Sequence, residues 1–207
     1  VDLDQGYLHD CLMTSLCTGR PVPGEQDGSL DQALVDDIDK FYEQKEFIKL
    51  TWNDAKFSKV SMANLTGDIM QRIDLVTSPS PQRPKFALYS GHDSTVMPLL
   101  AALAPEEWDG AWAPYASLLV FELYSDPAIF TDSPYRYYFR LVYNGKALQL
   151  EGCHTELCSL SVLRQHTAFW KEADCQEDAA TIPSSSLPVD KITTPSADSA
   201  DVQDFRE

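Results

Sequence analysis

A short polar segment, Tyr89–Thr95 (YSGHDST), contains the residue types best suited to chemistry. It follows a short apolar run, Lys85–Tyr89, and precedes an Ala/Leu-rich segment, so the pattern predicts a strand, a glycine-containing turn and a helix. Such a turn places polar side chains and helix N–H groups at the carboxyl edge of a sheet, where open α/β sheets usually bind ligands. The segment therefore predicts an anion-binding site.

Two neighbouring side chains of this segment suit phosphoryl transfer. His92 can donate a hydrogen bond whether it is neutral or cationic, and Asp93 can donate a proton when it is itself protonated. In phosphoryl transfer a donor stabilises the equatorial oxygens, and an acid protonates the leaving oxygen. His92 and Asp93 are therefore the candidate site residues.

The same residues also have simpler interpretations. Asp93 stands where an N-capping residue of the following helix would stand, and His92 can be an ordinary surface histidine. A serine hydrolase that uses Ser90 or Ser94 is the weaker alternative, because triad members come from separated positions and no Gly-x-Ser-x-Gly elbow occurs. The remaining histidines are assigned to structure or to the surface: His9, His154 and His166.

Hydrophobic periodicity predicts the elements that position this segment. Apolar residues recur at three- and four-residue steps in two helices, from Ser29 or Asp31 to about Ile48 and from about Phe57 to Val76. Two further helices are expected over 94–104 and about 159–170. Three strands and a hairpin complete the pattern: 85–89, 116–124, which is apolar enough to be covered on both faces, and 135–143, with an Asn144-Gly145 turn to 147–150. These elements predict an α/β layer architecture.

Composition and charge exclude several classes of protein. The 207 residues carry a formal net charge of −16, which argues against a nucleic-acid binder because such binding depends on clustered basic residues. At 43% hydrophobic residues the chain is too apolar for general disorder. No apolar run is long enough to span a membrane, and the first residues lack the features of a signal peptide.

Composition also divides the chain into three regions. Residues 1–30 are rich in Gly, Pro and Asp, which predicts a loop region containing Cys11 and Cys17. Residues 31–175 carry the periodic pattern of a folded domain. Residues 176–207 are rich in Ser, Thr and Pro, so they are expected to form a disordered acidic linker or stalk.

Five cysteines form two locally spaced pairs and one leftover: Cys11, Cys17, Cys153, Cys158 and Cys175. Neither pair has the two-residue spacing of a zinc knuckle, and Asn64 begins an N-glycosylation acceptor sequence. We therefore expect local disulfides, a glycan on Asn64, no metal site, and an extracellular, lysosomal or cell-surface protein of the secretory pathway. The unpaired cysteine suggests a partner outside this chain.

Several stretches, in order, resemble the C-terminal part of a histidine acid phosphatase. They are 86–95 (FALYSGHDST), 99–103 (LLAAL), 114–124 (PYASLLVFELY), the cysteine loop of Gly152-Cys153 with Cys158, and Leu65-Thr66-Gly67 in the second helix. The resemblance covers about residues 30–175. It implies part of a three-layer α/β/α domain with a largely parallel sheet.

The resemblance also implies an activity and roles for two residues. The family hydrolyses phosphomonoesters in two steps through a phosphohistidine, without metal or cofactor, with His92 as the phosphate-binding residue and Asp93 as the proton donor. Because an ordinary aspartate is largely ionised near neutral pH, an acidic optimum is expected. The expected partner is a phosphomonoester substrate and not a nucleic acid, while a homodimer and a membrane anchor beyond the C-terminus are both compatible with the sequence.

The chain departs from the family in its catalytic motif. The nucleophilic histidine of the resembling enzymes lies in Arg-His-Gly-x-Arg, and none of the seven arginines here is followed by histidine. The chain is therefore either the C-terminal portion of a longer phosphatase, incomplete and inactive alone, or part of a protein that has lost activity. The alternative function is a non-catalytic extracellular binding domain on the same scaffold.

Two cysteine positions bear on that choice. In the resembling enzymes the last core cysteine bonds back to the N-terminal half, so Cys175 favours the portion of a longer enzyme. Leu118 stands where relatives often carry a cysteine whose usual partner lies near Cys11. This difference leaves Cys11 and Cys17 to pair with each other.

Overall fold

The computed structural model of this chain describes residues 5–22, 24, 28, 30–78, 83–129 and 136–172. All of them belong to one unit, Val1–Ala173. The predicted stalk over 176–207 and the leftover Cys175 lie outside the described residues.

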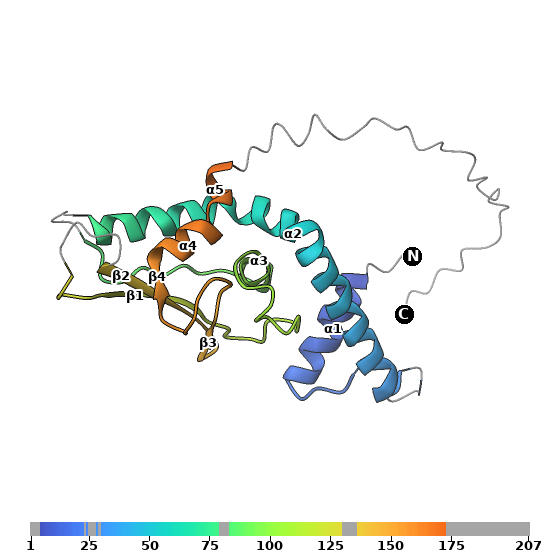
Figure 1. The fold of residues 1–207 in the computed structure, drawn as a ribbon. Coiled ribbons are helices and arrows are strands. Elements are labelled where there is room, and N and C mark those ends of the chain that lie inside the picture. The colour runs from blue at the N-terminus through green and yellow to red at the C-terminus, as the bar shows by residue number, and fades with distance from the viewer. Residues whose placement is uncertain are drawn as a thin grey trace, which may run out of the picture. The chain divides into compact units, whose positions relative to one another are not determined.

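The longest helical element, α2 (Gln32–Thr77), consists of two helices joined by a tight turn (Figure 1). Asp31 caps the first helix, because its carboxylate accepts a hydrogen bond from the Leu34 amide at 2.8 Å. Residues 53–55 have φ between 53° and 57°, the left-handed region, and they interrupt the helix. The two helices predicted from periodicity, ending near residue 48 and beginning near residue 57, are therefore confirmed.

An N-terminal helix, α1 (Gln5–Cys17), occupies part of the region predicted to be a loop, so that prediction is wrong there. Its apolar side chains pack against the start of α2, where Leu12, Val22 and Val35 form a small buried cluster. Most of the glycines and prolines that favoured a loop lie after residue 18, beyond the end of the helix. Burial of apolar residues stabilises α1 despite the composition of the wider region.

The predicted bond between Cys11 and Cys17 is also wrong. Both cysteines are exposed and unbonded. They stand six positions apart on α1, and six residues of helix rise about 9 Å, which exceeds the roughly 7 Å limit between the Cα atoms of a disulfide. The helix that replaced the expected loop therefore prevents the bond.

The sheet contains four strands: β1 (Leu119–Ser125), β2 (Tyr137–Tyr143), β3 (Lys146–Leu148) and β4 (Cys158–Ser159). Their order is β1-β2-β3, with β4 also paired to β2, and each of these pairings is antiparallel. The prediction of a largely parallel sheet is wrong for the described part of the chain. Parallel neighbours need a crossover of about a dozen or more residues, usually a helix. Here β1 is followed in the chain by its partner β2, and β2 by its partner β3, and among the described residues no helix lies between them.

The hairpin predicted at Asn144-Gly145 is confirmed. Both residues have positive φ, 47° and 85°, as a two-residue hairpin turn requires. By contrast, β1 is only half-buried and not covered on both faces as expected. Its Glu122 stands opposite Arg140 of β2 and forms an ion pair with it at 2.6 Å, so one face of the sheet carries polar groups.

The strand predicted at Lys85–Tyr89 does not form. Phe86 and Leu88 are 79% and 76% exposed. No backbone hydrogen bond links residues 85–91 to other described residues. A strand exists only through its pairing with a neighbour, and the described residues provide none at this position.

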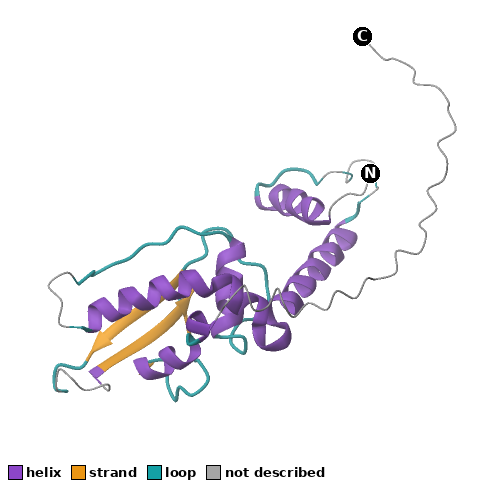
Figure 2. Cartoon of the chain, turned by 90° about the horizontal axis from the view of Figure 1, so that it is seen from above, coloured by secondary structure: helices purple, strands orange, loops and turns teal. Residues whose placement is uncertain are grey.

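Helices pack on the other face of the sheet and enclose the core. They are the second half of α2, α3 (Asp93–Leu103), α4 (Leu160–His166) and α5 (Phe169–Glu172), and α2 runs along the sheet in both views (Figure 1, Figure 2). The predicted helix over 159–170 is therefore two short helices. Gly67 allows α5 to approach, since a Cβ there would lie 2.9 Å from the Trp170 ring. Among the described helices we find none with the length and apolar character needed to cross a bilayer.

The predicted disulfide between Cys153 and Cys158 is confirmed, with an S–S distance of 2.09 Å. It joins the segment after β3 to β4 and is buried against the core. The bond therefore fixes a short loop next to the last strand of the sheet.

Replacing both of these cysteines by serine should lower the free energy of unfolding by about 2 kcal/mol, the value expected for releasing so short a loop. Urea denaturation of the chain measures this loss. The matched control is Cys11→Ser with Cys17→Ser, which removes two unbonded thiols and should leave the transition midpoint nearly unchanged. Equal losses in the two double variants would contradict the assignment.

Candidate functional site

The two predicted site residues lie at the N-terminus of α3. His92 is the N-cap, with φ −118° and ψ 176°, and Asp93 is the first helical residue. The backbone amide of His92 faces the Thr95 hydroxyl at 3.5 Å. Asp93 is thus not the N-cap that the simpler interpretation expected.

The backbone amides of Ser94, Thr95 and Val96, in the first turn of α3, already donate hydrogen bonds to groups of the same turn. The Ser94 amide donates to Asp93 Oδ1 at 2.6 Å, and the amides of Thr95 and Val96 donate to the His92 carbonyl at 2.9 and 3.0 Å. The helix amides are therefore less available to an anion than the sequence suggested. The exposed imidazole of His92 is the better placed group for binding one.

The Asp93 carboxyl group is half-buried and held from two sides. Besides the Ser94 amide on Oδ1, its Oδ2 accepts a hydrogen bond from the indole Nε1–H of Trp112 at 2.9 Å. Two donors fix the orientation of the carboxyl group, and each oxygen keeps a further lone pair for a ligand. Asp93 is therefore positioned as a proton donor or acceptor would be.

Trp112 is itself held by residues of α1 and α2. Its backbone amide donates to Glu43 Oε1 at 2.7 Å. Its ring centroid lies 5.6 Å from that of Tyr42 and 4.8 Å from that of His9. These contacts fix the indole that reaches Asp93.

Of the three histidines assigned to structure or surface, His9 has a clear structural role. It is 1% exposed, stacks on Tyr42 with centroids 4.4 Å apart, and its Nε2 lies 2.9 Å from Asp39. His154 is exposed, and His166 Nε2 is 2.8 Å from the Glu151 carbonyl. Sequence reasoning did not identify Trp112, because no local motif connects it to a carboxyl group nineteen positions earlier.

A tyrosine connects the segment before His92 to α2. The Tyr89 hydroxyl donates to Asp68 Oδ2 at 2.5 Å. The pKa of Tyr89 is raised, mainly because the side chain is partly removed from water. The hydrogen bond to Asp68 and the negative charge of Asp68 raise this pKa further. Tyr89 therefore stays protonated and anchors residues 85–91 to the second half of α2.

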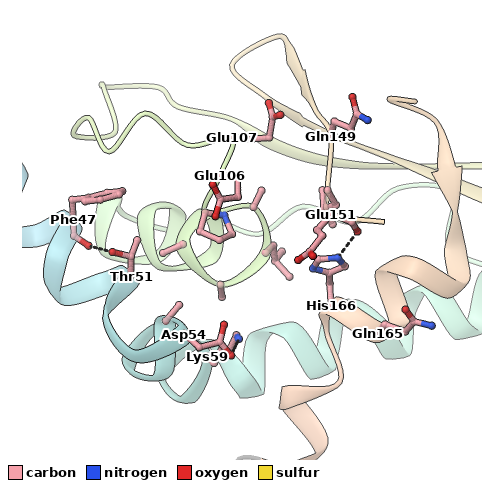
Figure 3. Close-up of a pocket in the computed structure, with 17 residues that line it drawn as sticks. Phe47, Thr51, Asp54, Lys59, Glu106, Glu107, Gln149, Glu151, Gln165 and His166 are labelled. Carbon is pink, nitrogen blue, oxygen red and sulfur yellow. Dashed lines mark hydrogen bonds and ion pairs between the residues drawn. The ribbon is translucent and has the colours of Figure 1, made fainter. Parts of the chain in front are cut away.

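Two cavities lie at opposite ends of α3. A cavity of about 180 Å³ contains Asp93 and Ser94 in its wall. A larger one of about 640 Å³ lies at the other end and contains neither His92 nor Asp93; Glu106, Glu107, Glu151 and His166 are among the residues around it (Figure 3). Within the residues described, no cluster of His, Cys, Asp and Glu is arranged to hold a metal ion. The smaller cavity is therefore the one that belongs to the candidate site.

Comparison with known proteins identifies the family. Residues 36–144, which include His92, Asp93 and Trp112, match the model of the histidine phosphatase superfamily (branch 2). This match covers more than half of the chain, so the chain belongs to that superfamily, in agreement with the resemblance to histidine acid phosphatases.

Several curated proteins to which parts of this chain are similar are named as phosphatases. The chain is 36% identical over 96 residues to lysophosphatidic acid phosphatase type 6 of Mus musculus (46% of this chain, 21% of the relative). It is 29% identical over 160 residues to 2-phosphoxylose phosphatase 1 of Xenopus tropicalis (72% and 29%). It is 36% identical over 105 residues to prostatic acid phosphatase of Bos taurus (50% and 26%). The chain thus spans less than a third of the length of these relatives.

The hydrogen bond between Trp112 and Asp93 should be measurable as stability. Trp112→Phe keeps an aromatic ring but removes the donor, and a lost hydrogen bond to a half-buried carboxyl group should cost about 1.5 kcal/mol of the free energy of unfolding. Urea denaturation of the chain gives the value. Trp52→Phe is the control, since Trp52 is 71% exposed and should change stability by less than about 0.5 kcal/mol. A Trp112→Phe loss no larger than the control would refute the interaction.

Proposed function

We propose that this chain supplies the proton-donor part of a phosphomonoester hydrolase site in a histidine acid phosphatase. The observation that carries the proposal is the Asp93 carboxyl group, held by Trp112 and the Ser94 amide beside the exposed His92. All of these residues lie inside the matched region. The names of the relatives, each a phosphatase, support the same class of reaction.

In the proposed reaction each residue of this chain has one role. His92 binds a phosphate oxygen, and Asp93 gives its proton to the leaving oxygen as the P–O bond breaks. A nucleophilic histidine, which sequence 1–207 does not supply in an Arg-His-Gly-x-Arg motif, takes the phosphoryl group. In the second step water attacks phosphorus and the P–N bond to the nucleophilic histidine breaks, which regenerates that histidine. The Asp93 carboxylate takes a proton from the attacking water, and inorganic phosphate leaves.

The proposal includes the cellular location of the protein. The disulfide between Cys153 and Cys158 and the exposed position of Asn64 support a secretory-pathway protein with a glycan on Asn64. The substrate is a phosphomonoester. A homodimer and a membrane anchor stay predictions.

A second candidate is a non-catalytic binding domain on the phosphatase scaffold. The exposed position of His92 suits this candidate as well, because binding a phosphate oxygen needs a hydrogen-bond donor but no nucleophile. A domain of this kind would still bind phosphate through His92. It would not turn a substrate over.

The test uses the natural polypeptide that contains residues 1–207, assayed in mild acid with butyl phosphate and with para-nitrophenyl phosphate. Asp93→Asn keeps the shape but removes the acid, so kcat for butyl phosphate should fall about 10²–10⁴-fold. The fall should be smaller for para-nitrophenyl phosphate, because nitrophenolate leaves without needing a proton. The wild-type kcat should rise as the pH falls from neutral into mild acid.

Asp31→Asn is the matched control, because Asp31 caps α2 and asparagine caps a helix equally well. Its kcat should equal that of the wild type. Normal turnover of butyl phosphate by Asp93→Asn would remove Asp93 from the proton-donor role. Phosphate binding without any turnover by the wild type would favour the binding domain.

A further inference from the structure

The cavity beside Asp93 is formed by elements that meet only because α2 is interrupted. Its volume is about 180 Å³. Glu46, Lys49 and Leu50 come from α2 before the left-handed turn, and Phe57, Ser61 and Met62 come from α2 after it. The start of α3 and Trp112 complete the wall. The turn over residues 53–55 therefore brings two parts of one helix to the candidate site.

The wall of this cavity is mainly apolar. Its apolar members are Leu50, Phe57, Met62, Met97, Pro98 and Trp112. Met97 is 2% exposed, while Phe57 is 54% exposed and therefore accessible from solvent. Methionine and aromatic side chains adapt well to the shape of an apolar ligand.

The charged members of the wall, apart from Asp93, neutralise each other. Lys49 and Glu46 form an ion pair one turn apart on α2. The Lys49 ammonium also lies 5.7 Å from the centroid of the Phe57 ring. The Lys49 ammonium is therefore not left free to bind a second anionic group of a ligand. The Asp93 carboxyl group is the reactive group that this cavity presents.

We infer that this cavity binds the alcohol portion of the substrate, and that the substrate is a phosphomonoester of an apolar alcohol. This inference rests on the proposed function. A general acid must lie within about 2.6–3.2 Å of the leaving oxygen, so the first carbons of the alcohol must lie next to Asp93. Among the described residues, the cavity that contains Asp93 in its wall is this mainly apolar one.

The size and chemistry of the cavity narrow the substrate class. Pockets for drug-sized ligands measure about 300–1,000 Å³, so this one holds a ring or the first part of a carbon chain. A sugar or polyol would lose water at several hydroxyl groups here, and the wall offers mainly the hydroxyls of Ser61 and Ser94 in exchange. An alkyl or aryl group gives up no hydrogen bonds to water, and its burial in the cavity is favourable.

The test compares methylphosphonate with butylphosphonate, which share a head group and differ in apolar length. Calorimetric titration of the natural polypeptide containing residues 1–207 should show an affinity gain of about threefold to fourfold for each methylene that enters the cavity. In Phe57→Ser the ratio of butyl to methyl affinity should fall about fivefold. Phe41→Ser is the matched control, since Phe41 is a 58% exposed phenylalanine of α2 away from the cavity, and it should keep the wild-type ratio.

Hydrolysis of methyl and butyl phosphate separates this inference from the function on which it rests. Chain-length-dependent binding without hydrolysis would support the cavity and refute the proposed reaction. Hydrolysis with equal kcat/KM for both esters would support the reaction and overturn the inference. Equal affinity for the two phosphonates, or equal effects of Phe57→Ser and Phe41→Ser, would overturn it as well.

Discussion

The hydrogen bond from the Trp112 indole to the Asp93 carboxyl group is the interaction on which the arrangement of the site depends. It ties the loop after α3 back to the start of that helix. Because Trp112 also contacts Glu43, Tyr42 and His9, the position of Asp93 depends on α1 and on the first half of α2. Without this bond, the carboxyl group at the start of α3 would be held only by the amide of the neighbouring Ser94.

The left-handed turn in α2 is the second constraint. For a residue other than glycine this conformation costs about 1–2 kcal/mol, and three such residues follow one another here. Local contacts offset that cost: the Ser58 hydroxyl donates to the Leu50 carbonyl across the break at 2.8 Å, Lys59 pairs with Asp54 at 2.6 Å, and Ala55 is buried. The turn persists because the helices on both sides of it pack against α3.

Local pattern predicted the parts of the fold that depend on local physics. The helices of α2, the start of α3, the Asn144-Gly145 hairpin and the short cysteine loop all follow from periodicity, turn chemistry and short spacing. The errors concern contacts between residues distant in the sequence. The packing of α1 against the start of α2 is one such contact, and it also explains why Cys11 and Cys17 do not pair. Whether Lys85–Tyr89 becomes a strand depends on a neighbour and not on its own composition, and the direction of the sheet depends on which strands are present to pair.

In the candidate site, too, the residues set by local pattern were predicted and those set by contacts between distant segments were not. The sequence predicted His92 and Asp93 as site residues because a histidine and an acid directly before a helix form a local pattern, and their catalytic roles stay a prediction. Trp112 and the cavity wall were not visible, because they arise where the two halves of α2, α3 and a loop meet. The expectation that helix amides would bind the anion was too simple, since the side chain of Asp93 and the His92 carbonyl already use those of the first turn.

The exposed segment before the site also affects how the chain behaves in concentrated solution. Within the part of the chain that the structure describes, the backbone amides and carbonyls of residues 85–91 have no hydrogen-bonded partner, and the apolar side chains of Phe86 and Leu88 lie beside them. This arrangement promotes edge-to-edge aggregation. Lys85 stands at the beginning of this segment, and charged residues at such edges oppose aggregation. The net charge of −16 adds a general repulsion between copies, which weakens as salt screens it. The colloidal stability of this acidic chain should therefore be greatest at low ionic strength.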